Sequence, residues 1–261
     1  MSLLELNNIS FAYSKVNGFN LSEISLTIED GNFVSIIGPN GSGKSTLLKL
    51  ISNYLQPESG NIKLYGKNYK KFGRKEFARE VAFVSQNSFS IFPFSVYEIV
   101  MMGRNPYLGF SGFENKSDRI KVLDALDKVG ILHLKNKGIN EISGGEAQRA
   151  FIARALVQEP KLILLDEPNA HLDIKHQIAV FGILKNLQIN ENVTVITVSH
   201  DLNLAASYSD KVILLKRGNL LMFDSTDKIF TRENIKDVFE VESEITKSNV
   251  SKEISIKILP S

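Results

Sequence analysis

The sequence contains no cysteine among its 261 residues. This absence excludes disulfides, thiolate metal sites and a cysteine nucleophile, and it fits a reducing compartment. Long apolar runs are also missing, because no window reaches the roughly 18 apolar residues that a membrane-crossing helix needs. The start of the chain, Met1 to Ile9, lacks the basic stretch and apolar core of a secretion signal. We therefore expect a cytosolic protein whose membrane role, if it has one, comes through a partner.

The chain has almost no charge imbalance, since 31 Lys and Arg against 29 Asp and Glu give a formal net charge of +2. Domains that bind nucleic acids usually show a clear basic excess, so the bulk charge does not indicate a nucleic-acid partner. Apolar residues at 43% and charged residues at 23% are ordinary values for a soluble globular protein. The length allows one large domain or a core with a smaller lobe.

The order of the apolar segments predicts an α/β fold. The stretch Leu4 to Phe33 alternates between apolar and polar residues with Gly and Asn between the runs, which favours a small antiparallel sheet. After Pro160, short strands alternate with helices, which favours a parallel sheet. The predicted strands are Phe33–Ile37, Ile62–Tyr65, Val81–Val84, Lys161–Leu165, Val193–Val198 and Val212–Leu215, and the predicted helices are Lys44–Leu55, Glu114–Val129, Gly145–Gln158, Lys175–Gln188 and Leu202–Ser207.

The middle of the chain has a different character. Ser88 to Phe113 is rich in aromatic residues and glycine, and the amphipathic pattern that follows is helical. We therefore predict a sheet-containing core at 1–87 and 160–240, and an inserted helical subdomain at 88–159. The remaining residues, 241–261, form a polar tail to which the sequence assigns no role.

One segment matches the phosphate-loop pattern G-x-x-x-x-G-K-[ST], and it consists of Gly38, Pro39, Asn40, Gly41, Ser42, Gly43, Lys44 and Ser45. The glycines let successive backbone N–H groups turn inward around phosphates. Lys44 can then reach the β- and γ-phosphates, and the Ser45 hydroxyl can bind Mg²⁺. Thr46 adds a hydroxyl at a helix start, where the helix dipole favours an anion. The alternative is a glycine-rich turn with a surface lysine, but an apolar strand before the motif and helix formers after it favour the loop.

Two adjacent acids follow a buried strand that ends at Leu165. Ligands bind at that end of parallel strands, and there Asp166 is suited to hold Mg²⁺ through water, with Glu167 placed to polarise an attacking water. The alternative is a pair of solvated acids that cap a strand. With the phosphate loop in the same chain, the metal and base roles are favoured. The two motifs predict a P-loop NTPase core, with a parallel sheet flanked by helices, a small antiparallel β-subdomain and an inserted helical subdomain.

A third motif lies between the first two and consists of Ser143, Gly144, Gly145 and Glu146, followed by a helical segment to Leu156. A serine hydroxyl and glycine amides at a helix start can receive an anion. Here the sequence resembles the ATP-binding cassette family, whose signature is LSGGQ followed by such a helix. Ile142 and Glu146 replace the leucine and glutamine of that signature, and both changes are mild. An ordinary serine cap is the alternative for an isolated Ser-Gly-Gly, and the other two motifs disfavour it.

Further positions match the family and take their expected roles from the resemblance. Tyr13 stands where the family stacks an aromatic on adenine, and Gln86 where a glutamine senses Mg²⁺ and the γ-phosphate. Leu172-Asp173 matches the dimer-contact loop, and His200 the switch histidine that contacts the γ-phosphate. Asn169 departs from the usual threonine or serine, which bears on the dimer contact. The resemblance thus implies ATP and Mg²⁺, with Lys44, Glu167 and His200 as the catalytic residues.

In the family, two ATPase chains face head to tail, and the signature of each completes the nucleotide site of the other. The resemblance therefore implies a homodimer. Phe92 to Tyr107, Glu146 and the run Asn169 to Gln177 resemble the subunits that energise uptake of iron–siderophore, haem and cobalamin. Two membrane-spanning permease subunits are expected to dock near Gln86–Tyr107, although aromatic residues there can also pack internally.

The expected protein is the ATPase subunit of a metal-chelate importer, peripheral on the cytoplasmic face of the cell membrane, served indirectly by an extracytoplasmic substrate-binding protein. The alternative is a soluble ATP-gated clamp that acts on nucleic acid or protein, which the nearly neutral charge does not favour. The resemblance does not identify the cargo, because the binding protein and the membrane subunits select it.

Overall fold

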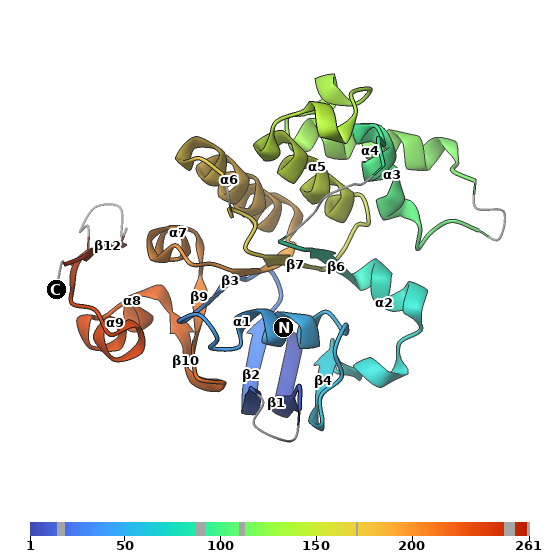
Figure 1. Cartoon of the computed structure of the whole chain (residues 1–261). Coiled ribbons are helices and arrows are strands. Elements are labelled where there is room, and N and C mark those ends of the chain that lie inside the picture. Colours follow the sequence, from blue (N-terminus) through green and yellow to red (C-terminus); the bar gives the residue numbers. More distant parts are fainter. Residues whose placement is uncertain (15–18, 87–91, 110–112, 171, 248–253, 260–261) are drawn as a thin grey trace. The chain divides into compact units, whose positions relative to one another are not determined.

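The computed structural model describes residues 1–14, 19–86, 92–109, 113–170, 172–247 and 254–259 (Figure 1). The chain divides into two compact units. The first consists of Met1–Lys71 and Thr194–Ser261, and the second is Phe72–Val193. The predicted subdomain boundaries at 87/88 and 159/160 stay a prediction. No helix among the described residues is long and apolar enough to cross a bilayer.

An antiparallel sheet in the first unit confirms the prediction for Leu4 to Phe33. Its strand order is β2-β1-β4-β5, and β1 pairs with both β2 and β4. One face is apolar, because Leu4, Leu6 and Ile9 of β1 are buried. The four strands are β1 (Ser2–Ala12), β2 (Asn20–Glu29), β4 (Ser59–Leu64) and β5 (Lys67–Asn68).

Parallel strands form a second sheet segment in the first unit, where β3 lies between β8 and β9. Every residue of β3 is buried, as expected for a parallel strand that is covered on both faces. The polar residue in it, Ser35, accepts a hydrogen bond of 2.7 Å from Ser209 Oγ. The strands are β3 (Phe33–Ile37), β8 (Thr194–Val198), β9 (Lys211–Lys216) and the antiparallel edge strand β10 (Asn219–Ser225).

The α-helices in the described part of the first unit are α1 (Lys44–Ile51), α7 (Leu202–Tyr208), α8 (Thr226–Ile229) and α9 (Arg232–Phe239). The prediction that α1 runs to Leu55 was wrong. Asn53 has a left-handed φ of 61°, and the N–H groups of Tyr54 and Leu55 both bond the Lys49 carbonyl. This turn ends the helix at Ile51.

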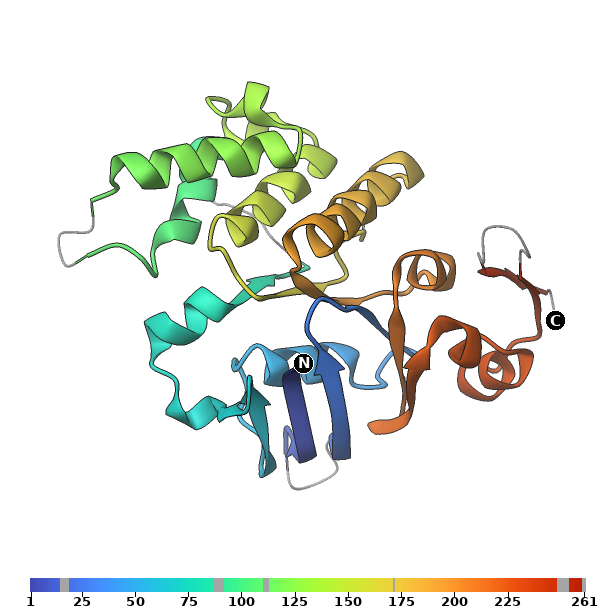
Figure 2. The ribbon, with the colours of Figure 1, turned by 180° about the vertical axis from the view of Figure 1, so that it is seen from behind.

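The polar tail contains a hairpin that the sequence did not predict. Strand β11 (Ser243–Lys247) pairs antiparallel with β12 (Ile254–Ile258), and the two contact α9 and α7 respectively (Figures 1 and 2). Ile254 and Ile256 are each 5% exposed and belong to one apolar cluster with Ala205 of α7. Residues 248–253 and 260–261 of the tail lie outside the described residues.

The second unit is mainly helical and contains one pair of parallel strands, β6 and β7. Val81–Val84 was predicted as a strand with these bounds, and the prediction is confirmed. The elements are α2 (Arg74–Glu80), β6 (Val81–Val84), α3 (Val96–Met101), α4 (Lys116–Lys128), α5 (Gly144–Leu156), β7 (Leu162–Asp166) and α6 (Ile174–Glu191).

A buried arginine ties three of these elements together. Arg104, 4% exposed, donates from Nε to Asp118 Oδ1 of α4 at 2.8 Å and from Nη1 to the Val157 carbonyl at 2.8 Å. It also bonds Glu159 Oε2 at 2.8 Å, and its guanidinium lies 3.8 Å from the centre of the Tyr107 ring. The cluster therefore holds α4, the end of α5 and the segment after α3 in one arrangement.

Candidate functional site

The predicted phosphate loop joins β3 to α1 in the first unit. At its start Gly38 has a φ of 154°, and a Cβ there would lie 2.2 Å from the Leu215 carbonyl oxygen of β9. At its end Gly43 has a φ of 104°, and a Cβ would lie 2.6 Å from the Phe19 ring. Both positions therefore require glycine for conformation and for space.

Two polar side chains of the loop indicate whether it is suited to bind phosphates. Ser42 is buried, and its hydroxyl has no hydrogen-bond partner among the described residues. Lys44 is also buried, and its Nζ donates to the carbonyls of Gly38 at 2.9 Å and Pro39 at 3.0 Å. The ammonium group is thus held over the loop backbone. A buried hydroxyl and a buried ammonium beside a helix start form a donor set that suits a polyphosphate.

Tyr13 lies at the first turn of α1. Its hydroxyl is 3.3 Å from Thr46 Oγ1, and its ring meets that of Phe11 edge to face with 4.9 Å between centroids. The side chain is 57% exposed, so the free face of the ring is open to a planar ligand. Ser45 follows Lys44 in the same helical turn. The structure therefore brings Tyr13 and Thr46 together.

His200 follows β8 at the edge of the sheet segment where β3 ends. The strands are parallel, with Ile36 beside Val198, so their carboxyl ends lie at the same edge. Ser199 fixes the backbone there, since its Oγ donates to the Asp201 carbonyl and accepts from the Asp201 N–H, both at 3.1 Å. The phosphate loop and the exposed His200 thus leave the same edge of this sheet segment, where ligands of parallel sheets bind.

In the second unit the acids stand at the carboxyl end of β7. Asp166 is 8% exposed. Glu167 has a left-handed φ of 49°, a conformation that costs about 1 kcal/mol for a non-glycine residue. Gln86, just beyond β6, donates from Nε2 to Glu167 Oε2 at 2.7 Å. Two residues predicted for the same chemistry therefore share a hydrogen bond.

The described residues contain no group of three His, Asp or Glu side chains that could hold a metal ion by themselves.

The predicted signature forms the start of α5. Ser143 caps the helix, and its Oγ accepts from the Glu146 N–H at 3.4 Å. In return Glu146 Oε2 accepts from the Ser143 N–H and hydroxyl, each at 2.8 Å. These hydrogen bonds lower the pKa of the Glu146 carboxyl below its ordinary value. Ser143 and Gly144 are exposed, whereas Gly145 is buried.

The loop before α6 contains a contact that the sequence reasoning missed. Asp173 caps α6, and its Oδ1 accepts from the His176 N–H at 2.9 Å and lies 2.7 Å from His176 Nδ1. The sequence signal that could have revealed this contact is a histidine three residues after an aspartate at a helix start. His171 in the same loop lies outside the described residues.

The segment predicted to receive the permease subunits is only partly described, because residues 87–91 lie outside the described part. Of its aromatic residues, Phe92 is exposed. Tyr107 instead packs internally, since its hydroxyl donates to the Gln158 carbonyl at 2.9 Å and its ring lies against Arg104. The internal-packing alternative therefore holds for Tyr107.

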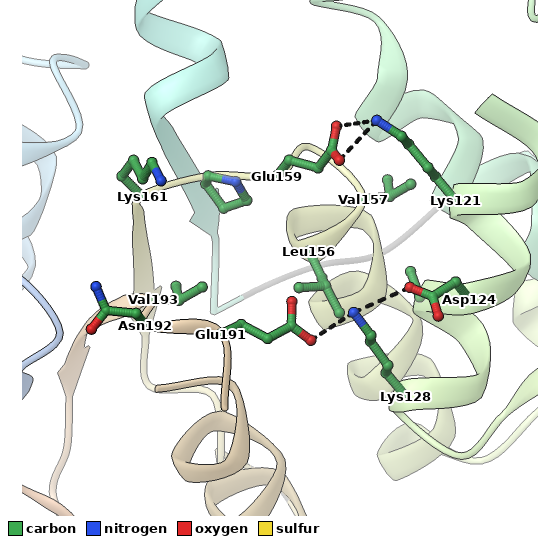
Figure 3. A pocket seen from close by; sticks show the side chains of 12 residues that line it. Lys121, Asp124, Lys128, Leu156, Val157, Glu159, Lys161, Glu191, Asn192 and Val193 are labelled. Atoms are coloured by element: carbon green, nitrogen blue, oxygen red, sulfur yellow. Dashed lines mark hydrogen bonds and ion pairs between the residues drawn. The ribbon is translucent and has the colours of Figure 1, made fainter. Parts of the chain in front are cut away.

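A cavity of about 240 Å³ in the second unit lies at the start of β7, at the opposite end of this strand from Asp166 (Figure 3). Lys121 bonds Glu159 at 2.6 Å, and Lys128 bonds Asp124 at 3.1 Å and Glu191 at 2.6 Å. Asp124 belongs to α4 itself, whereas Glu159 follows α5 and Glu191 ends α6, so the two lysines tie α4 to the ends of α5 and α6.

Known proteins are similar to this chain in sequence and in fold. The ABC transporter family profile matches residues 21–170. The haemin import ATP-binding protein HmuV of Escherichia coli O157:H7 is 37% identical over 230 residues, which cover 86% of this chain and 88% of that protein.

Two solved structures are similar in fold. A metal-chelate type ABC transporter in an inward-facing conformation is 30% identical with a TM-score of 0.87, and the match covers 100% of this chain and 98% of that one. A dimeric ATP-binding cassette bound to ADP and Pi is 29% identical with a TM-score of 0.74, over 86% of this chain and 99% of that one.

Proposed function

Because this chain belongs to the ABC transporter family, whose nucleotide-binding subunits are ATPases, we propose that it hydrolyses ATP to power uptake of a metal chelate through partner membrane subunits. The observation that carries the proposal is the pairing, in one chain, of a phosphate loop with a signature turn at the start of α5. The cargo class is suggested by the relatives that are named for haemin and metal-chelate transport.

The phosphate loop binds the triphosphate in this proposal. The backbone N–H groups of the Gly38–Ser45 loop, other than at Pro39, surround the β- and γ-phosphates together with the Lys44 ammonium. The α1 dipole and the Thr46 hydroxyl add to the attraction. Tyr13 stacks on the adenine ring, and the open face of its exposed ring supports this role.

Hydrolysis is assigned to Glu167 as the general base. Gln86 donates to one oxygen of that carboxylate at 2.7 Å and so orients the group, which would polarise a water and receive its proton. His200 contacts the γ-phosphate and, with Lys44, stabilises the charge that builds up on it. Mg²⁺, held by Ser45 and Asp166 and sensed by Gln86, would supply further charge neutralisation. The assignment of these residues to a single nucleotide site is based on the sequence motifs and on the family relationship.

The site is completed by a second copy of the chain. We assign to the Ser143–Glu146 turn of that copy the role of donor to the γ-phosphate, which makes the ATP part of a homodimer interface. The dimeric relative bound to ADP and Pi supports this arrangement. Ser143 and Gly144 are exposed residues at a helix start, where an anion can approach.

Coupling to transport requires two permease subunits, which we place on the Gln86–Tyr107 segment, and an extracytoplasmic substrate-binding protein acting through them. The chain itself would sit peripherally on the cytoplasmic face of the cell membrane. The transport names of the relatives favour this function over a soluble clamp on nucleic acid or protein. Copurification with a polytopic membrane protein would support it, and ATPase activity that no membrane partner changes would contradict it.

The test of the catalytic assignment is Glu167→Gln. The variant should keep ATP binding, lose turnover by about 10²- to 10⁴-fold and accumulate as an ATP-bound dimer in size-exclusion chromatography. Glu233→Gln, at an exposed glutamate of α9, is the matched control and should behave as wild type. Hydrolysis by Glu167→Gln at a rate near that of wild type would show that Glu167 is not the base.

A further inference from the structure

The ring of His176 rests on the second glycine of the signature. A Cβ at Gly145 would lie 2.4 Å from His176 Cδ2 and 2.7 Å from Cγ, distances that real Cβ atoms do not adopt. Gly145 is buried under this ring. The glycine is therefore required by the close approach of α6 to α5, in addition to any contact that its N–H makes with a phosphate.

The same histidine is anchored to the loop before α6. Its backbone N–H and its Nδ1 both bond Asp173 Oδ1, at 2.9 and 2.7 Å. Because a carboxylate only accepts, Nδ1 carries the proton of this hydrogen bond. The ring is thus held in one orientation from the Asp173 side while its other edge covers Gly145. The His176 side chain remains 32% exposed, so the link stands at the surface of the second unit.

Leu172 lies near the same turn. A Cβ built at Gly144 would lie 4.0 Å from Leu172 Cδ2, an ordinary van der Waals distance. Of two consecutive residues, Leu172 therefore lies beside Gly144, and Asp173 holds the His176 ring that covers Gly145. Because the two segments are remote in sequence, the His176 ring against Gly145 is a tertiary contact between them.

We propose that His176 is a positioning residue that fixes the signature turn to the Leu172–Asp173 loop, so that the two segments meet a second copy of the chain as one rigid element. The inference rests on the proposed function, in which the signature turn faces the partner, and on the expectation from the family resemblance that the Leu172–Asp173 loop contacts the partner as well. If contact with the second copy shifts the Leu172–Asp173 loop, the signature turn then moves with it relative to the nucleotide. Conversely, a change in the position of the signature turn shifts the loop. Two surfaces joined in this way are energetically coupled.

The direct experiment is His176→Ala in the Glu167→Gln background, with the ATP concentration that gives half-maximal dimer as the readout. That concentration should rise by about tenfold, within the usual range of coupling between sites. In the hydrolytically competent chain, kcat should fall by a similar factor. The affinity of the variant for a fluorescent ATP analogue should stay within about twofold, because the phosphate loop belongs to the other unit.

A double-mutant cycle separates positioning from a direct effect on the phosphate. Gly145→Ala should impair dimer formation because its methyl group collides with the His176 ring. In the His176→Ala background the methyl has room, so adding Gly145→Ala should cause little further loss. If the two losses simply multiply, Gly145 acts independently of His176 and the proposal is overturned.

Two further variants test the halves of the link. His176→Asn keeps a side-chain N–H at the Nδ1 position and should recover part of the coupling, whereas His176→Phe keeps the ring without the donor. Neither should shift the melting temperature by more than about 4 °C, since the side chain is partly exposed. Full activity of His176→Ala would refute this inference alone. Absence of ATP hydrolysis in the wild type would instead refute the proposed function.

Discussion

The Glu146 carboxylate carries a negative charge at the turn that is proposed to receive a phosphate. In the structure this charge is directed back onto the Ser143 N–H and hydroxyl at the start of α5. The helix cap therefore uses the carboxylate that replaces the glutamine of the family signature. The Ser143 hydroxyl has to leave this carboxylate before it can donate to a phosphate.

The lowered pKa of Glu146 predicts a pH dependence of stability. The backbone hydrogen bond from Ser143 is the largest cause of the shift, followed by that from the Ser143 hydroxyl. A depressed carboxyl pKa stabilises the fold above the ordinary value of 4.5, and this stabilisation is lost as the pH falls below it through the folded pKa. Glu146→Gln should therefore flatten the acid side of the unfolding free-energy curve by less than about 1 kcal/mol, measured by urea denaturation.

Glu98 provides the matched control because it caps α3 with Ser95 in the same way, and its pKa is lowered for the same reason. Glu98→Gln should change the acid limb similarly and leave the ATP concentration for dimer formation unchanged. Glu146→Gln should lower that concentration, since it removes a like charge from the phosphate. If the two variants need the same ATP concentration for dimer formation, the proposed effect of the Glu146 charge on the phosphate is wrong.

At the scale of elements, the buried Arg104 cluster is a polar connection between several segments of the helical unit. Burial raises the pKa of the Asp118 carboxyl, but hydrogen bonds from the Asn115 N–H and from Arg104 outweigh it and the net shift is downward. Arg104→Met leaves this carboxylate buried and without its guanidinium. We expect a loss of about 3–5 kcal/mol in the free energy of unfolding by chemical denaturation.

Arg119 is the control for Arg104, because its ion pair with Glu114 is exposed at 2.9 Å. Arg119→Met should change stability by less than about 1 kcal/mol. Adding Asp118→Asn to Arg104→Met should restore part of the loss, since it removes the uncompensated charge. Equal effects of Arg104→Met and Arg119→Met would show that the buried cluster contributes no more than a surface pair.

A second prediction at this scale concerns the C-terminal hairpin. Asn203 of α7 donates from Nδ2 to the Ile256 carbonyl at 3.1 Å and accepts from the Ile256 N–H at 2.8 Å, as a neighbouring strand would. Asn203→Ala should lower stability by about 1–2 kcal/mol and speed hydrogen exchange at the Ile256 amide. Asn203→Asp keeps the acceptor and should protect that amide. Unchanged exchange in Asn203→Ala would mean that apolar packing alone holds the hairpin.

At the scale of the whole molecule, the chain is predicted to act as a homodimer with shared nucleotide sites, and mixing two inactive variants tests this prediction. Ser143→Arg disables a signature, and Lys44→Ala disables a phosphate loop. A mixed dimer retains one composite site with both parts intact. If chains associate at random and sites act singly, the mixture should recover about a quarter of wild-type ATPase activity.

The control for this experiment mixes Lys44→Ala with the double variant Lys44→Ala/Ser143→Arg. No combination of these chains contains an intact site, so the ATPase rate should stay at background. Activity in the control would indicate a contaminating ATPase. No recovery in the first mixture would contradict the shared-site arrangement.

The α/β fold class and the ATPase identity were predictable from the sequence, and the family relationship confirms both. The reason is that the phosphate loop, the acids after β7 and the signature turn are each contiguous. Local strand, turn and helix preferences shape such segments, and glycines such as Gly38 and Gly43 mark the conformations that they need. The roles assigned to individual site residues stay predictions.

Contacts between distant segments were decided only by the tertiary structure. Neither the hydrogen bond from Gln86 to Glu167 nor the His176 ring over Gly145 is visible in local patterns, because each joins residues that packing brings together. The hairpin on Asn203 is the clearest case, since a polar tail gains its order from a few isoleucines buried against α7 and α9. Local sequence therefore determined the chemistry of each motif, and burial of apolar surface between remote segments decided which motifs are linked.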